Sequence, residues 1–237
     1  MEGDRMHVVS ADEWNEARRE LLAEEKEFQV RRDELARKRR SLPWRLVDAH
    51  YVFEGEDGVR GLAELFGESS QLVVYHFMFH PDWSEGCKSC SFWADSFDRS
   101  IEHLRARDTS MVAVSRAPHA KLANYQLAMG WTFPWFSSSR SRFNADFNVS
   151  FTPEEVKAGS ATYNYASGAL VGEEMPGISI FAKTEEASVY HTYSTFARGL
   201  DPFNATYQYL DIVPRGRDEA EFSNPMEWLR RRGEYSR

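Results

Sequence analysis

Cysteine is scarce in this sequence of 237 residues, which contains only two. A small secreted domain held by disulfides is therefore excluded, because such folds need several cysteine pairs. Long hydrophobic runs are missing as well. The longest, from Leu72 to Phe79, is interrupted by His76 and is too short to cross a bilayer. We therefore expect no membrane partner.

Positive charge is also in short supply. The chain has 29 Lys and Arg against 37 Asp and Glu, for a net charge of -8 at pH 7. Nucleic acid is not an expected partner, because general nucleic-acid binders carry a basic footprint. The first residues include Glu2 and Asp4 and lack the apolar stretch of a signal peptide, and no lipidation pattern is present. We expect a cytoplasmic protein, in which thiols rest reduced.

Aromatic residues, by contrast, are abundant at 14% of the chain. We expect most of them to fill the hydrophobic core, because they lie on predicted strands and on the apolar stripe of predicted helices. Trp83 is the exception. It lies in a loop just before the two cysteines, where we expect it to line a site.

A long helix is predicted at the N-terminus. Ser10 followed by Glu13 is a capping-box pattern, the helix extends to about Arg40, and Pro43 ends it. The apolar stripe of this helix is thin. A thin stripe suits a helix that packs on the outside of a domain or against a partner subunit, as in a homodimer. The stripe consists of Trp14, Ala17, Leu21, Phe28 and Leu35.

The following segment has the pattern of a strand, a helix and a second strand. Residues 72–79 and 110–115 are apolar without alternation, which is typical of strands buried on both faces of a parallel sheet. A helix over 87–107 is predicted between them, giving a βαβ unit, whose crossover is right-handed in nearly all cases. Another helix over 118–129 should end at Gly130.

Other elements are predicted around this unit. Residues 137–175 read as an insertion, with a short strand over 147–151 and a helical turn capped by Thr152. The segment from 214 onward is polar and expected to be loose, apart from a last turn at Trp228 and Leu229. Strands are expected at 47–53, 131–136, 178–183 and 188–194, and helices at 61–66 and 202–210.

The two cysteines, Cys87 and Cys90, lie three residues apart where a buried strand leads into a helix. The unpaired N–H groups and positive dipole end of a helix N-terminus stabilise a thiolate, and can lower its pKa from about 8.5 to roughly 3.5–7.5. Cys87, the more exposed, should attack a substrate, and Cys90 should resolve the mixed disulfide. The ammonium of Lys88 would favour the thiolate further.

Polar residues near the cysteines are candidates for tuning this chemistry. His80, Asp82 and Glu85 lie in the preceding loop, where they would tune or relay protons to a thiolate, although solvation is the commoner fate of such residues. Arg116, after the second strand, is either an anion contact or an ordinary ion-pair partner.

A zinc site is the rival interpretation of the same region. His76, His80, Cys87 and Cys90 have spacings that zinc ligands use. We favour the absence of a metal, because the two histidines straddle the end of a buried strand and a core of this size does not need structural zinc. No cofactor site is identifiable in the sequence.

Pro176 lies directly before the predicted strand 178–183, in the tripeptide Met175-Pro176-Gly177. A proline peptide bond is the only kind that becomes cis at low cost. A cis-proline loop facing the cysteines would present backbone groups and Met175 to a substrate, whereas the simpler interpretation is an ordinary turn.

Several of these segments resemble a bacterial family of unknown function, the DUF899 type, placed among thioredoxin-like proteins. The resemblance covers about residues 7–218 and implies a thioredoxin-like α/β fold, with a central mixed sheet flanked by helices. It also implies that Pro176 occupies the cis-proline position of that superfamily. The matching segments are YHFMF (75–79), GCKSCSFWAD (86–95), SRAP (115–118), MGWTFPW (129–135), EMPGIS (174–179) and HTYSTFARG (191–199).

The predicted organisation is a helical extension over 7–45, a thioredoxin-like domain over 46–218 and a polar tail over 219–237. The predicted function is thiol–disulfide exchange with a protein or small-molecule disulfide or thiol. One alternative is a peroxiredoxin-like peroxide reductase, since Pro81, Ser84 and Cys87 approximate the order that those enzymes use. The other is a binding module that kept the fold without its chemistry.

Overall fold

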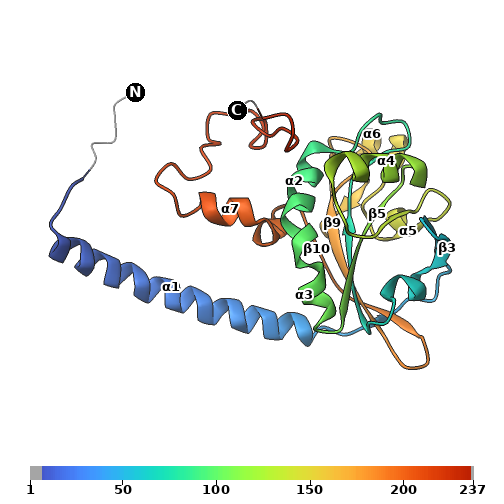
Figure 1. Cartoon of the computed structure of the whole chain (residues 1–237), viewed down its shortest axis with the longest axis horizontal. Helices are drawn as coiled ribbons and strands as arrows, with labels where there is room; N and C mark the ends of the chain where they lie inside the picture. Colours follow the sequence, from blue (N-terminus) through green and yellow to red (C-terminus); the bar gives the residue numbers. More distant parts are fainter. Residues whose placement is uncertain (1–6, 236–237) are drawn as a thin grey trace. The chain divides into compact units, whose positions relative to one another are not determined.

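The computed structural model describes residues 7–235, and the chain divides into two compact units with the boundary between Pro43 and Trp44. The first unit is essentially one helix, α1 (Ala11–Arg40) (Figure 1). Its predicted capping box is confirmed: the Ser10 hydroxyl accepts from the Glu13 amide, and the Glu13 carboxylate accepts from Ser10. No side chain of α1 is buried.

The second unit is built on a sheet of eight strands in the order β1-β10-β9-β4-β5-β6-β2-β3. At its centre β4 (Gln71–His76) runs parallel to β5 (Thr109–Ser115) and antiparallel to β9 (Gly177–Lys183), which pairs with β10 (Val189–Phe196). A parallel βαβ unit extended by an antiparallel hairpin is the thioredoxin-like arrangement. The predicted fold class is thus confirmed.

The helix after β4 is shorter than predicted. It consists of α2 (Lys88–Phe97), a 3₁₀ turn η2 (Asp98–Ser100) and α3 (Ile101–Arg105). The single helix over 87–107 is interrupted because the buried carboxylate of Asp98 accepts from the amides of Thr132 and Phe133, at 2.7 and 3.2 Å. In contrast, α4 (His119–Met129) ends at Gly130 in the left-handed conformation, as predicted.

Other sequence predictions need correction. The predicted strand 47–53 is replaced by two short strands, β1 at one edge of the sheet and β2 beside the strand at the other edge. The strand 131–136 shortens to β6, and the helix 61–66 is a 3₁₀ turn. Residues 147–151 form no strand and contribute only a bridge from Ser150 to Glu174. The bounds are β1 Arg45–Leu46, β2 Val52–Gly55, β3 Gly58–Gly61, η1 Leu62–Phe66, β6 Trp135–Ser137 and α5 Phe143–Asp146.

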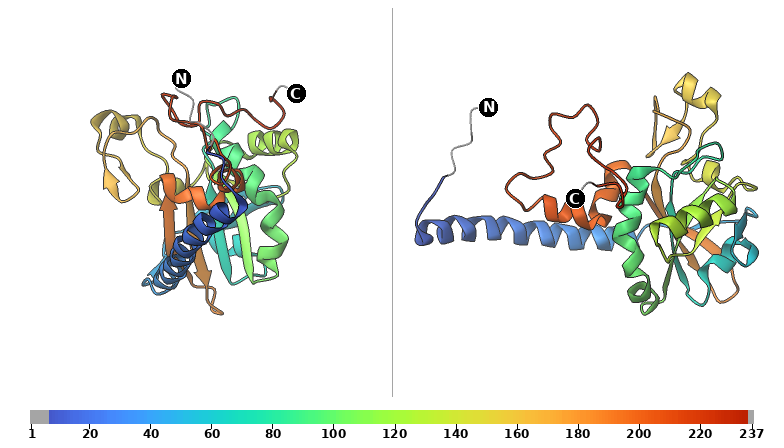
Figure 2. Two further views of the ribbon diagram at one scale, coloured as in Figure 1. Left: turned by 90° about the vertical axis from the view of Figure 1, so that its left-hand side faces the viewer. Right: turned by 45° about the horizontal axis from the view of Figure 1, so that its top comes forward.

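The remaining elements lie in the predicted insertion and after β10. Thr152 caps α6 as predicted, and Figure 2 shows the segment around α6 and β8 standing away from the strands of the main sheet. The predicted helix 202–210 is a 3₁₀ segment followed by α7. The bounds are α6 Pro153–Ala158, β7 Thr162–Tyr163, β8 Ala166–Ser167, η3 Ala197–Phe203 and α7 Ala205–Leu210.

Most aromatic residues fill the core, as expected. One cluster, on the α2 side of the sheet, contains Tyr75, Phe77 and Cys90, and a second contains Phe53, Phe66 and Phe143. Leu72 and Val74 of β4 belong to the second cluster and Tyr75 to the first, so alternate residues of β4 face opposite sides and the strand is buried on both, as predicted. In the described part of the chain, every helix is too short or too polar to span a membrane.

Candidate functional site

The two cysteines lie where the loop after β4 meets α2, with Cys87 as the N-terminal cap residue. The Cys87 amide donates to the Met78 carbonyl at 3.1 Å, and the Met78 amide donates to the Cys90 sulfur at 3.4 Å. Gly86 is required for this close approach, because a Cβ there would lie 2.8 Å from ring carbons of both Phe77 and Tyr125. The start of α2 is thereby fixed against the end of the central strand.

The two thiols have very different environments. Both are free; Cys87 is partly exposed and Cys90 is buried. Hydrogen bonds from the Cys90 thiol, and then from the Cys90 and Ser89 amides, lower the pKa of Cys87 to about 6 against the opposing effect of burial. Burial and the neighbouring Cys87 sulfur raise the pKa of Cys90. Cys87 is therefore the thiol that ionises at neutral pH, and Cys90 keeps its proton.

The contacts of the two residues between the cysteines differ from the expectation that the ammonium of Lys88 favours the thiolate. Lys88 donates from its ammonium to the backbone carbonyl of Leu229, at 3.1 Å. Ser89 supplies both a backbone and a side-chain hydrogen bond that lower the pKa of Cys87. Sequence reasoning missed Ser89, although a residue in the first turn of a helix is a plain candidate to bond an N-cap sulfur.

The C-terminal segment is held close to the cysteines rather than loose. The Arg231 guanidinium donates to the Tyr125 hydroxyl at 2.7 Å and to the Gly86 carbonyl at 3.1 Å, and it forms an ion pair with Glu85 at 2.9 Å. Leu229 is buried. The expectation of a loose tail is therefore wrong, whereas the last turn expected at Trp228 and Leu229 is present. Hydrogen bonds to backbone carbonyls hold the segment in place, which its polar composition did not indicate.

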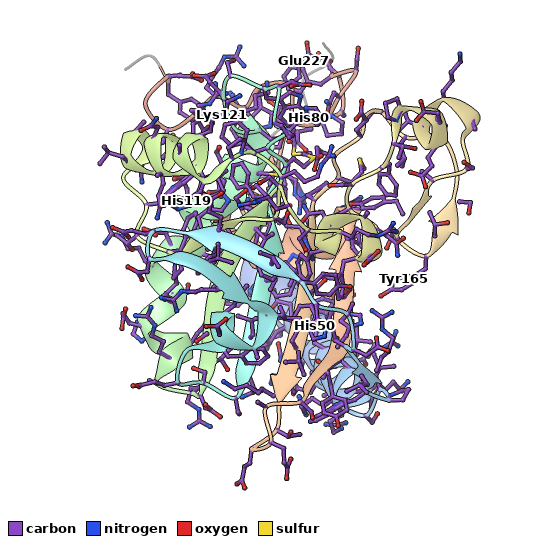
Figure 3. All side chains as sticks on the ribbon, turned by 90° about the vertical axis from the view of Figure 1, so that its right-hand side faces the viewer. His50, His80, His119, Lys121, Tyr165 and Glu227 are labelled. Atoms are coloured by element: carbon purple, nitrogen blue, oxygen red, sulfur yellow. The ribbon has the colours of Figure 1, made fainter. Side chains whose placement is uncertain are left out.

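The loop before the cysteines is held by the residues around it. His80 accepts from the Asp82 amide through Nδ1 at 3.1 Å, and its Nε2 lies 3.7 Å from the Glu173 carboxylate. Lys121 donates to the Trp83 carbonyl at 3.1 Å. Figure 3 shows His80 and Lys121 at the same end of the molecule, where Glu227 of the C-terminal segment also lies. The exposed Trp83 ring is 6.2 Å from the His80 ring.

Arg116 forms an ion pair rather than lying free for an anion. Its guanidinium pairs with the buried Glu174 carboxylate, which also accepts from the Ser150 hydroxyl at 2.7 Å. Burial raises the pKa of Glu174, and the charge of Arg116 and the Ser150 hydrogen bond oppose that rise. This network fixes the residue directly before Met175.

Met175 and Pro176 are also held by backbone bonds. The Met175 amide donates to the Val149 carbonyl at 2.9 Å, and the Tyr163 hydroxyl donates to the Pro176 carbonyl at 2.7 Å. No peptide bond among residues 7–235 is cis. The predicted cis-proline at Pro176 is therefore wrong. The insertion orients this loop through Val149 and Tyr163 while the bond keeps the trans form, which X-Pro bonds favour by about 0.5–1 kcal/mol.

A cavity of about 1120 Å³ opens beside the buried cysteine. Tyr75 lies at its cysteine end, where burial and the neighbouring Cys90 thiol raise the pKa of its hydroxyl. Trp83 is not among the lining residues. The C-terminal segment supplies part of the wall, including Met226. The residues lining the cysteine end are Tyr75, Met78, Ser89, Cys90, Met175 and Pro176.

The four candidate zinc ligands are not brought together. His76 donates to or accepts from the Ser179 hydroxyl at 2.8 Å, and its ring stacks on Phe143, in the core cluster on the face away from Cys90. Burial lowers the pKa of His76 to about 3. Within residues 7–235, no group of three or more His, Cys, Asp and Glu side chains is placed to hold a metal ion.

The sheet order and the cysteine pair at the start of α2 define a thioredoxin-like protein. The chain belongs to a bacterial family of unknown function (DUF899), whose model matches residues 3–235. No relative among curated proteins matches the sequence.

Several solved structures have a similar chain trace at low sequence identity. One is peroxidoxin BcpB from Mycobacterium tuberculosis, 18% identical, with a TM-score of 0.45 over 71% of this chain and 97% of that one. Another is peroxiredoxin Q from Xanthomonas campestris, 12% identical, with a TM-score of 0.45 over 71% and 94% of the two chains.

Proposed function

We propose that the chain is a thiol–disulfide oxidoreductase, with Cys87 as the nucleophile and Cys90 as the resolving thiol. The observation that carries this proposal is the paired shift of the two thiols, with a pKa of about 6 for Cys87 and a raised pKa for Cys90. The lowered pKa favours the Cys87 thiolate at neutral pH, and the thiolate is the reacting form.

The reaction follows from this difference in pKa between Cys87 and Cys90. The Cys87 thiolate attacks one sulfur of a substrate disulfide, forms a mixed disulfide and releases the other sulfur as a thiolate. Cys90 then gives up its proton, attacks the Cys87 sulfur and releases the second thiolate, and the two released thiolates take up protons. The substrate disulfide gains two electrons and the cysteine pair becomes a disulfide. A thiol reductant restores the dithiol by the reverse steps.

The cavity beside Cys90 is the proposed substrate site. Met175 and Pro176 line it together with Ser89 and Cys90. We propose that a substrate attached to Cys87, one helical turn before Cys90, lies against that loop. Trp83 is exposed in the loop that leads to Cys87, where it is available to contact a protein substrate. A cytoplasmic setting, which keeps thiols reduced, completes the proposal.

A trapping experiment tests this function. Cys90→Ser should accumulate a mixed disulfide on Cys87 when the protein is treated with glutathione disulfide, and intact-protein mass spectrometry would detect the added mass. Cys87→Ser is the matched control and should form no adduct on Cys90 under the same conditions, because the pKa of Cys90 is raised. An unmodified Cys90→Ser protein would overturn the proposal.

Peroxide reduction is the competing chemistry for the same pair. It would oxidise Cys87 to a sulfenate, which Cys90 would convert to a disulfide with release of water. A peroxiredoxin-like arrangement would use the hydroxyl of Ser84 beside Cys87, whereas the main hydrogen bonds to Cys87 come from Cys90 and Ser89. We therefore favour disulfide exchange. Stopped-flow measurement of hydrogen peroxide consumption separates peroxide reduction from disulfide exchange. The third alternative, a binding module without chemistry, would show an ordinary Cys87 pKa near 8.5.

A further inference from the structure

Helix α1 exposes large apolar side chains along one line. Two helical turns are close to seven residues, so side chains seven apart lie above one another and drift by only about 20° at each step. Four such side chains, which we call the α1 stripe, are about half exposed: Trp14 (58%), Leu21 (51%), Phe28 (63%) and Leu35 (47%).

The period of the α1 stripe indicates what covers it. A strict seven-residue apolar repeat keeps facing a second helix that winds around the first with a left-handed supercoil. From Trp14 to Leu35 the α1 stripe advances by 21 residues, which is three heptads and most of the helix. The 30 residues of α1 correspond to a helix about 45 Å long.

The charge of α1 is divided between its two halves. Residues 11–25 contain six acidic and two basic side chains, whereas residues 26–40 contain three acidic and seven basic ones. A parallel partner of the same sequence would place acidic half on acidic half and basic half on basic half. An antiparallel partner places each acidic half on a basic half, which is favoured by Coulomb attraction.

We infer that α1 is a self-association element that pairs antiparallel with α1 of a second copy of this chain. A twofold axis between residues 24 and 25 brings Trp14 next to Leu35 of the partner subunit, and Leu21 next to Phe28 of the partner subunit. The same axis joins the oppositely charged halves, so the apolar spacing and the charge pattern select one arrangement. This inference does not rest on the chemistry of the cysteines.

Sedimentation equilibrium of the full chain tests the association. The expected mass is about twice 27.4 kDa, and dissociation should increase with salt because the attraction is between exposed charges. Leu21→Glu/Phe28→Glu should yield monomers with unchanged helix content. Val30→Glu is the matched control: Val30 is equally exposed, at 57%, but lies about 200° around the helix from Phe28, so this variant should stay dimeric.

Cross-linking tests the direction of the pair. In a Cys87→Ser/Cys90→Ser background, Glu24→Cys should form an intermolecular disulfide, because the twofold axis lies beside it. Ala11→Cys should not, because its copies would lie at opposite ends of the pair. A monomeric wild type, or a dimer that survives Leu21→Glu/Phe28→Glu, would overturn the inference. Cross-linking at both positions would indicate a parallel pair and overturn the orientation.

Discussion

The ammonium of Lys88 donates a hydrogen bond to the carbonyl of Leu229, although Lys88 lies between the two cysteines in the sequence. Leu229 is buried, and Arg231 near it bonds to the Gly86 carbonyl. The main bonds that lower the pKa of Cys87 come instead from Cys90 and Ser89. Lys88 therefore joins the C-terminal segment to the start of α2.

Lys88→Ala should loosen the C-terminal segment and leave the acidity of Cys87 nearly unchanged. The variant loses one hydrogen bond, worth about 1.5–3 kcal/mol because the donor is charged. Hydrogen exchange should rise over residues 226–232, and the pH midpoint of Cys87 alkylation should stay near 6. Lys88→Arg, which keeps a donor, is the control. An upward shift in the Cys87 midpoint would contradict the role assigned to Lys88.

Cys90→Ala should raise the pKa of Cys87 toward the ordinary thiol value of about 8.5. The variant removes the thiol hydrogen bond that is the largest cause of the lowered pKa. Iodoacetamide reacts with the thiolate, so the rate below pH 8 should fall. Cys90→Ser keeps a hydroxyl donor and should shift the pH midpoint less. Equal midpoints for wild type and Cys90→Ala would show that Cys90 does not stabilise the thiolate.

Much of the fold was predictable because strong local patterns coincide with the core. The apolar run of β4 and the capping box at Ser10 each determine local structure by themselves. The greater exposure of Cys87 relative to Cys90 also followed, because a helix start exposes its cap residue and buries the residue one turn later.

Other features depend on contacts between distant parts of the chain. Arg231 reaches Gly86, and Tyr163 holds the Pro176 carbonyl, and neither pairing has a local signature. The break of the helix at Asp98 arises in the same way, since its carboxylate caps the loop at Thr132. Such long-range hydrogen bonds between side chain and backbone depend on the packed fold, and the spacing of residues in the sequence does not reveal them.

Arg116→Ala should destabilise the protein more at neutral than at acidic pH. The variant leaves the buried Glu174 carboxylate without its cation, which costs about 3–5 kcal/mol when the charge is retained. The pKa of Glu174 is already raised by burial and should rise further without Arg116. A carboxyl whose folded pKa is raised destabilises the fold as pH rises, so protonation at low pH should relieve the loss.

Urea unfolding at pH 7.5 and pH 5 measures this effect. Arg116→Ala/Glu174→Gln is the control, because a neutral amide at 174 has no charge to leave unpaired, and its stability should depend less on pH. Equal losses for Arg116→Ala at both pH values would show that Glu174 does not carry the uncompensated charge.

His76 should make the fold sensitive to acid. Burial lowers its folded pKa to about 3, whereas the unfolded chain takes up the proton near 6.5. The unfolded state therefore binds more protons below pH 6.5, and stability is lost as pH falls toward 3. Between pH 7 and 4.5 the loss from this group is about 2–3 kcal/mol. Burial also lowers the pKa of His191, which acts in the same direction.

His76→Gln keeps a hydrogen-bonding side chain for Ser179 but cannot titrate. It should be less stable than wild type at pH 7, because the ring no longer stacks on Phe143, yet its unfolding free energy should fall less between pH 7 and 4.5. The two unfolding free energies should therefore converge as the pH is lowered. Parallel curves across this range would show that His76 takes up its proton equally in the folded and unfolded chains.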